Sequence, residues 1–263
     1  MQTHSLAGIR VMVTRPEHQA QALCQLVTEQ GGQAVCFPVI EIKAFNLSDT
    51  AADLIANLSD IDFAIFISPN AVEYGLARIL AHGKIPDKLK LVTIGKVSAQ
   101  KLQQLTGRTA DIYPAEHYNS EALLALESMQ HDKVDNKRVL IFRGRGGREL
   151  LARSLTHRGA VVDYAEVYQR KEPRVDGHLL DAAWGSDVPD IVTVTSNEGL
   201  TNLLAMTTSK QYRQQLLQTP LVVVTEKMRL NAQTLGFKND IIVAAKAGNE
   251  ALLESVQDWA QQK

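Results

Sequence analysis

The sequence contains little cysteine, few aromatic residues and no excess of charge of either sign. Its 2 cysteines, Cys24 and Cys36, stand in apolar surroundings outside any CxxC or Cys/His spacing. They indicate neither a disulfide framework nor a zinc site, so a reducing cytosol is the expected compartment. The 28 Lys and Arg nearly balance the 29 Asp and Glu. The net charge of −1 therefore gives no global positive field to attract nucleic acid or an anionic membrane.

The sequence also lacks a long apolar run, which argues against a membrane-spanning segment, and residues 1–10 lack the pattern of a secretory signal. The 45% of hydrophobic residues and 22% of charged ones are the proportions of a folded globular protein. A chain of 263 residues is long enough for two domains of about 150 residues or one large domain. No apolar stripe exceeds what two cores require, so a monomer is expected.

Four segments recur in the same order along the chain, which indicates two copies of one unit. The first two pairs are 11–15 with 139–143 and 62–70 with 190–197, both at an offset of 128 (139 − 11 and 190 − 62). The other two are 91–96 with 221–227 and 119–124 with 248–253, at offsets near 130 (221 − 91). Two copies are too few for a solenoid.

Short β-branched runs alternate with longer amphipathic stretches, which predicts an α/β fold with parallel sheets. The predicted strands are almost wholly apolar, as expected when helices cover both faces of a sheet. They lie at residues 9–14, 63–68, 91–94, 138–142, 191–196 and 221–225. Capping side chains are expected at residues 119–121 and 248–250, and helix ends at Gly31, Gly107, Gly159 and Gly236.

Two further predicted strands, 39–45 and 164–171, alternate polar and apolar residues, so each is expected to have a solvated face. Glu41 and Lys43 are polar positions of the first strand, and Pro38 and Pro173 bracket the pair. A pair of half-exposed strands between two sheets predicts a linker crossing between two domains.

The carboxyl ends of the predicted strands carry small hydroxyl residues, glycines and cations. Ligands of open α/β sheets bind at these ends, where backbone N–H groups of helix N-termini point outward. The pattern indicates an anionic ligand with several carboxylates or phosphates, held by amides and hydroxyls. The candidate binding residues are Arg15, Ser68, Asn70, Gly95, Lys96, Arg143, Gly144, Gly146, Ser196, Asn197, Thr225 and Lys227.

Each of these residues also has a purely structural interpretation. Ser, Asn and Gly at strand-to-helix junctions are ordinary N-caps. Residues 143–148 hold three arginines and three glycines and are equally consistent with a solvated basic turn, because they match neither GxGxxG nor GxxxxGK[ST]. Lys96 and Lys227 are consistent with exposed helix starts.

Familiar catalytic motifs such as HExxH and GxSxG are missing from the sequence. The one candidate catalytic residue is Tyr168, at the end of the second predicted linker strand and expected to face the region between the two copies. A phenol donates a proton or a hydrogen bond but is a poor base at neutral pH. Taken from its position alone, Tyr168 is also consistent with a packing residue.

An ordered set of segments resembles the uroporphyrinogen-III synthase family over essentially the whole chain. It consists of the run Phe-Ala-Ile-Phe-Ile-Ser-Pro-Asn-Ala-Val at 63–72, the Ile94-Gly95 junction, the cap at 119–123, Glu166-Val167-Tyr168 and the strand at 192–196. The resemblance implies two flavodoxin-like parallel-sheet domains from an internal duplication, joined by a two-stranded β linker, with a cleft between them. The implied bounds are 1–37 plus 174–263 for one domain, 38–46 and 164–173 for the linker, and 47–163 for the other domain.

The resemblance further implies a cofactor-free and metal-free lyase that cyclises the linear tetrapyrrole hydroxymethylbilane, inverts its ring D and expels water. The substrate carries many acetate and propionate arms, and a transient hand-over from hydroxymethylbilane synthase is compatible with this role. Tyr168 matches the family's candidate for assisting departure of the hydroxyl, and Ser68, Ser196 and Thr225 match cleft positions. Where some members have adjacent threonines, this chain has Thr225-Glu226, so Lys227 or backbone amides are expected to bind a carboxylate there.

Two other functions are compatible with the same residues. A non-catalytic, two-lobed cytosolic sensor for a polyanionic small molecule would also use two α/β lobes and a hinge. The glycines after Arg143 suggest a second alternative, a nucleotide- or sugar-phosphate-dependent enzyme. The absence of the phosphate-loop and dinucleotide-binding motifs disfavours this alternative.

Overall fold

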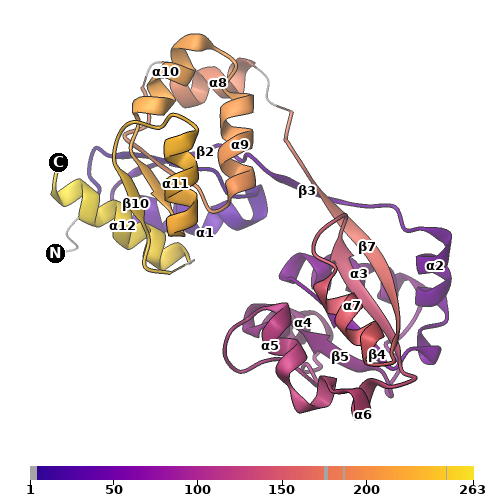
Figure 1. The fold of residues 1–263 in the computed structure, drawn as a ribbon. Helices are drawn as coiled ribbons and strands as arrows, with labels where there is room; N and C mark the ends of the chain where they lie inside the picture. Colours follow the sequence, from indigo (N-terminus) through magenta and orange to yellow (C-terminus); the bar gives the residue numbers. More distant parts are fainter. Residues whose placement is uncertain (1–4, 175–176, 186, 247) are drawn as a thin grey trace. The chain divides into compact units, whose positions relative to one another are not determined.

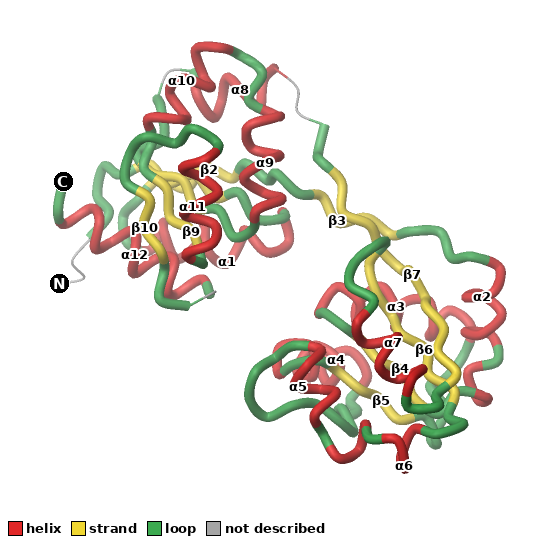
Figure 2. Tube along the Cα trace, in the orientation of Figure 1, coloured by secondary structure: helices red, strands yellow, loops and turns green. Residues whose placement is uncertain are grey.

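The computed structural model describes residues 5–174, 177–185, 187–246 and 248–263, and the chain forms two compact α/β units (Figures 1 and 2). Unit 1 consists of Met1–Glu41 and Lys171–Lys263, and unit 2 consists of Ile42–Arg170. Unit 1 therefore takes its chain from both ends of the sequence, whereas unit 2 is one continuous segment. No helix of the described residues is long and apolar enough to cross a membrane.

Unit 1 is built on a five-stranded sheet with the strand order β10-β9-β8-β1-β2, and the neighbouring strands are parallel. The strands are β1 (Arg10–Val13), β2 (Gln33–Cys36), β8 (Ile191–Thr193), β9 (Leu221–Val223) and β10 (Ile241–Val243). The helices are α1 (Glu17–Glu29), α8 (Gly177–Trp184), α9 (Asn197–Met206), α10 (Lys210–Gln218), α11 (Glu226–Thr234) and α12 (Asn249–Gln261).

The core of unit 1 follows from the two-residue period of the interior strand β1. Val11 and Val13 are fully buried and share a cluster with Leu23 of α1 and Val256 of α12. Met12 between them is also fully buried, although its side chain points to the other face of the strand. Because β1 is buried on both faces, its sequence is a continuous apolar run without alternation.

Unit 2 is built on a second five-stranded sheet with the order β3-β7-β6-β4-β5, in which β7, β6, β4 and β5 pair in parallel. The strands are β3 (Glu41–Ala44), β4 (Phe63–Phe66), β5 (Lys90–Thr93), β6 (Arg138–Gly144) and β7 (Val161–Lys171). The helices are α2 (Asp49–Ala56), η1 (Leu58–Asp60), α3 (Pro69–His82), α4 (Lys96–Thr106), α5 (Ser120–Ala125), η2 (Glu127–Met129), α6 (His131–Val134) and α7 (Leu150–His157).

Successive residues of β4 divide between two apolar layers, one on each face of this sheet. Ala64 and Phe66 belong to one layer, and Phe63 and Ile65 belong to the other. In the first layer the rings of Phe66 and Phe142 stack with centroids 4.7 Å apart. α3 crosses them at Gly75, where a Cβ would lie 2.7 Å from the Phe142 ring.

The two sheets repeat one pairing scheme, with offsets of 128 to 130 positions between equivalent strands (192 − 64 and 221 − 91). Arg10 pairs with Gln33 in unit 1, and Arg138 pairs with Val161 in unit 2, each 128 positions later (138 − 10 and 161 − 33). The pairs that β1 makes with β8 recur between β6 and β4, and the pairs between β8 and β9 recur between β4 and β5. The strand order β2-β1-β8-β9-β10 of unit 1 is the flavodoxin-like order 2-1-3-4-5.

Every strand predicted from an apolar run is present, although most are one to three residues shorter than predicted. The two polar-alternating strands are β3 and the second half of β7, and both lie in the sheet of unit 2. The four predicted helix-ending glycines all have positive φ, from 71° at Gly107 to 97° at Gly236. One predicted cap is wrong: α12 begins after Gly248 without a side-chain cap, and Asn249 lies inside the helix.

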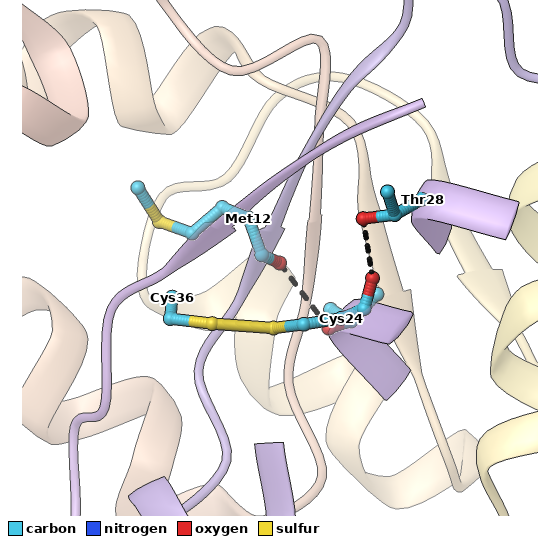
Figure 3. Close-up of a disulfide and its surroundings, with 5 residues drawn as sticks. Met12, Cys24, Thr28 and Cys36 are labelled. Atoms are coloured by element: carbon cyan, nitrogen blue, oxygen red, sulfur yellow. Dashed lines mark hydrogen bonds between the residues drawn. A yellow bond between two sulfur atoms is a disulfide. The ribbon is translucent and has the colours of Figure 1, made fainter. Parts of the chain in front are cut away.

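Cys24 of α1 and Cys36 of β2 form a disulfide across 12 positions of sequence (Figure 3). The sequence-based expectation of no disulfide is therefore corrected. Helix α1 and strand β2 belong to one strand-helix-strand unit, and packing of the helix on the strand brings the two sulfur atoms together. The spacing of the two cysteines in the sequence is not a CxxC motif and did not indicate this pairing. The two Cα atoms are 7.1 Å apart.

Candidate functional site

The candidate site of unit 2 lies at the carboxyl ends of β6, β4 and β5. Because these three strands are adjacent and parallel, the segments that follow them meet at one edge of the sheet. A pocket of about 210 Å³ opens there, between the first turns of α3 and α4. Its lining residues are Ile67, Ser68, Pro69, Ile94, Gly95, Lys96, Val97, Ser98 and Tyr118.

Ser68 has two partners at this edge. Its Oγ accepts a hydrogen bond of 3.0 Å from the N–H of Ala71, so Ser68 is the N-cap of α3, as the structural interpretation of the sequence predicted. The same Oγ lies 3.2 Å from the hydroxyl of Tyr168. A hydroxyl has one donor and two acceptor positions, so Ser68 still has a position for a third group in the pocket.

Tyr168 is buried in unit 2, with 4% of its surface exposed. Its ring lies against Gly144, where a Cβ would come within 2.7 Å of two ring carbons, and 5.9 Å from the ring of Tyr74. Only a residue without a side chain fits at position 144. Tyr168 therefore packs as the structural interpretation predicted, while its hydroxyl reaches the pocket residue Ser68.

Gly95 and Lys96 form the opposite wall of the pocket, at the start of α4. Gly95 is buried under Tyr118, whose Cβ would lie 2.7 Å from a Cβ at position 95. Lys96 is exposed. Asn70, the second residue of α3, is 9% exposed, so it is the least accessible of the polar candidates in this segment.

The loop after β6 is held by Arg143, which is buried rather than solvated. Arg143 is 4% exposed, and its guanidinium lies 4.6 Å from the centroid of the Tyr164 ring. Its Nε donates to the carbonyl oxygen of Gly144 at 3.2 Å, and its Nη2 donates to that of Gly146. This corrects the interpretation of a solvated basic turn for Arg143, because the side chain is buried and two of its nitrogens donate to nearby carbonyl groups.

In unit 1, Arg15 follows β1 and is partly buried. Its Nη1 donates to Oδ1 of Asn249 at the start of α12, and burial lowers its pKa. The Nε is buried and, within the described residues, has no hydrogen-bond partner. An uncompensated donor on a desolvated cation favours binding of an anion.

The other candidates of unit 1 follow β8 and β9. Ser196 caps α9 and Thr225 caps α11, their hydroxyls accepting from the N–H groups of Gly199 at 2.9 Å and Met228 at 3.2 Å. Asn197 accepts from the side-chain amide of Asn231 at 2.9 Å. Lys227 is exposed in the first turn of α11.

The structure gathers Ser68, Gly95 and Lys96 into one pocket and places Gly144 and Tyr168 directly behind Ser68. Sequence reasoning missed two residues here. Tyr118 covers Gly95, and Glu166 accepts the Gly146 N–H at 3.0 Å. The signal for Glu166 was available, because it alternates with Tyr168 along a strand next to β6. The described residues contain no group of three His, Cys, Asp or Glu side chains arranged for a metal ion.

Taken together, the fold and the site define an α/β protein of two parallel-sheet units, with hydroxyls, amides and cations at the carboxyl ends of its strands. Comparison with known proteins narrows this class. The family model for uroporphyrinogen-III synthase HemD matches residues 21–254. The chain belongs to the uroporphyrinogen-III synthase family, and the identification made from the sequence is confirmed.

Two relatives cover nearly the whole chain. The uroporphyrinogen-III synthase of Salmonella typhimurium is 36% identical over 249 residues, which cover 94% of this chain and 99% of that protein. The enzyme of that name from Escherichia coli is 34% identical over 248 residues, with the same coverage. A crystal structure of uroporphyrinogen-III synthetase from Helicobacter pylori matches with a TM-score of 0.63 at 17% identity, covering 95% of this chain and 99% of that one. The α/β fold with parallel sheets is therefore common to both.

Proposed function

We propose that this protein cyclises hydroxymethylbilane to uroporphyrinogen III with inversion of ring D and loss of water, as a cofactor-independent lyase of haem biosynthesis. The observation that carries the proposal is the 36% identity to a uroporphyrinogen-III synthase over 94% of the chain. The site is compatible with it, because a substrate with many carboxylate arms suits the hydroxyls, amides and cations at the strand ends.

The proposed reaction begins with departure of the terminal hydroxyl of the substrate as water, which leaves an azafulvene-type cation. The substituted carbon of ring D attacks this cation to form a spiro intermediate. The spiro intermediate fragments and closes again with ring D inverted, and loss of a proton completes the macrocycle. Because the substrate also closes spontaneously to isomer I, the protein must chiefly impose geometry.

Tyr168 and Ser68 are the proposed groups at the leaving hydroxyl. Their oxygens are 3.2 Å apart, and Ser68 lines the pocket while the Tyr168 ring is buried behind it. In this arrangement Tyr168 donates to Ser68, and the Ser68 hydroxyl donates to the departing oxygen. A chain of two hydroxyls polarises its terminal donor more than one hydroxyl alone. This refines the sequence-based hypothesis, in which Tyr168 donates directly.

The remaining candidates are proposed to hold the carboxylate arms. Arg15 offers a partly buried guanidinium in unit 1, and Lys96 and Lys227 offer exposed ammonium groups. Binding of the substrate between the two units, hand-over from hydroxymethylbilane synthase, a cytoplasmic location and a monomeric state stay predictions from the sequence. Descent of both units from one duplicated unit is proposed as well, supported by the nearly constant offset between their strand pairs.

The test is an assay in which the purified protein is present while hydroxymethylbilane is generated, followed by oxidation and chromatographic separation of isomers I and III. We expect mostly isomer III with the wild type. Tyr168→Phe keeps the ring packing and removes the donor, and we expect its turnover to fall by about 10-fold or more. A folded wild-type protein that yields only isomer I would overturn the proposal, and binding of substrate without conversion would then favour the two-lobed sensor.

A further inference from the structure

The three arginines at the end of β6 and in the loop that follows it have different surroundings, although the sequence places them in one basic turn. The guanidinium of Arg143 donates to the carbonyl oxygens of Gly144 and Gly146. A Cβ at Gly147 would lie 2.7 Å from its Nη2. Arg143 therefore shapes the loop from inside and has no role at its surface.

The loop is also fixed to the neighbouring strand β7. The N–H of Arg145 donates to the carbonyl oxygen of Tyr168 at 2.8 Å, and the N–H of Gly146 donates to Glu166. The guanidinium of Arg145 lies 5.1 Å from the centroid of the Phe45 ring. With its backbone held at two successive residues, the loop is preorganised, which lowers the entropy lost when it binds a ligand.

Arg148 is open to solvent, in contrast to Arg143. Its side chain is 84% exposed, and its Nη1 lies 3.9 Å from Oε1 of Glu121, which is itself 55% exposed. An ion pair this open to water is weak and easily replaced. Arg148 follows β6, the strand that pairs with β4, so its loop leaves the sheet at the same edge as Ser68. Glu121 lies in the first turn of α5, three positions after the pocket residue Tyr118.

From these contacts we infer that Arg148 binds one carboxylate arm of the substrate at the rim of the pocket, and that this carboxylate displaces Glu121. Glu121 is then an internal competitor that occupies the guanidinium in the free protein. Arg143 is a positioning residue, because it acts only through the loop that carries Arg148. This inference rests on the proposed function, since it names the group on the substrate.

The experiment compares the KM and kcat of isomer III formation in the wild type and five variants. Arg148→Gln is expected to raise KM about 10-fold, as loss of one charge-assisted contact does, with kcat within about twofold of the wild type. Arg148→Lys is expected to restore part of the loss. Glu121→Gln is expected to lower KM, and in the Arg148→Gln background it is expected to change nothing, because its partner is gone.

Arg153→Gln is the matched control. Arg153 lies on α7, five positions after Arg148, is 79% exposed and pairs with Glu149 at 2.7 Å, so its loss removes the same charge from the same region. It is expected to leave KM unchanged, and none of these exposed substitutions is expected to move Tm by more than about 2 °C.

Two failures are distinguishable. If the wild type forms no isomer III, the proposed function and this inference both fall. If the wild type is active but Arg148→Gln and Arg153→Gln share its KM, or if Glu121→Gln raises KM, the inference alone is overturned.

Discussion

Gly144 determines the position of the Tyr168 ring, because the absence of a side chain at position 144 makes room for it. A Cβ at this position would lie 2.7 Å from two ring carbons, well inside van der Waals contact. The ring is buried on its other sides and cannot move without disturbing the core. Position 144 therefore controls where the Tyr168 hydroxyl stands relative to Ser68.

We predict that Gly144→Ala lowers the free energy of unfolding by about 1–3 kcal/mol, the usual cost of overpacking, and reduces isomer III formation. Urea unfolding followed by circular dichroism measures the first effect. Tyr168→Ala removes the ring, so adding Gly144→Ala to that variant is expected to cost little. A penalty of equal size in both backgrounds would show that the ring is not the obstacle.

A second residue-scale prediction concerns Tyr212 of α10, whose hydroxyl donates to Asp181 at 2.8 Å. This hydrogen bond, followed by desolvation and the negative charge of Asp181, raises the pKa of Tyr212 above its ordinary value of 10.0. A raised pKa in the folded state means that the stabilisation is fully present below about pH 10 and is lost as pH rises through the folded value.

We therefore expect the wild type to lose stability more steeply above pH 10 than Tyr212→Phe does, and the two curves to run parallel below it. Denaturant unfolding from pH 7 to 11.5 measures this, with Tyr113→Phe in unit 2 as the control. A constant difference between wild type and Tyr212→Phe up to pH 11.5 would contradict the prediction.

At this scale the sequence identified residue types better than their contacts. Ser68 and Ser196 could be interpreted as helix caps, and both cap a helix, because a hydroxyl between a strand and a helix is a local pattern. The burial of Arg143 was not foreseen. It depends on Tyr164, which is 21 positions away in sequence but on the adjacent strand.

At the scale of elements, helix starts at the strand ends combine two tasks, capping a helix and presenting a polar group. Ser68 performs both, whereas Ser48 at the start of α2 caps Ala51 at 3.2 Å and lies outside the pocket. The two positions therefore separate the stabilising effect of a cap from its effect on the reaction.

We predict that Ser48→Ala and Ser68→Ala each destabilise the protein by about 1 kcal/mol, as loss of an N-cap does. Only Ser68→Ala is expected to reduce isomer III formation, because only its hydroxyl lies beside Tyr168. Thermal unfolding and the isomer assay measure the two effects. Equal activity in both variants would remove Ser68 from the proposed mechanism.

Strands that are buried on both faces were predictable, whereas two short edge strands of unit 1 were missed. β4 and β8 are fully buried and were found as apolar runs. β2 and β10 lie at the edges of the unit 1 sheet and combine partly buried with exposed residues, and β10 has only three residues. Short edge strands carry little periodicity, so their pairing is decided by the sheet they join.

At the scale of the whole molecule, the two units differ in how the chain enters them. Unit 2 is continuous, whereas unit 1 combines β1, α1 and β2 from the first part of the chain with β8, β9 and β10 from the last part. The sequence repeats predicted two similar sheets. The resemblance alone supplied the division of unit 1, because contacts between β1 and β8 span about 180 positions and leave no local signal.

We predict that residues 38–173 expressed alone fold and unfold cooperatively, since they contain the complete sheet of unit 2 and both of its apolar layers. Near-ultraviolet circular dichroism during heating measures this. Residues 171–263 alone are the control and are expected to stay unfolded, because their sheet lacks β1 and β2, and β1 is the strand that pairs with β8. A non-cooperative transition in the 38–173 fragment would contradict the independence of unit 2.

Because unit 1 is formed from both ends of the chain, its sheet cannot be completed until late in synthesis. A ribosome adds about 5–20 residues per second, and β1 is complete long before β8, its partner at residues 191–193. For roughly 10–40 seconds at that rate the three fully buried residues of β1 cannot pair with β8, and unit 2 is completed before β8 is made. The opening segment of the chain is therefore the part with the longest need for chaperone protection in the cell.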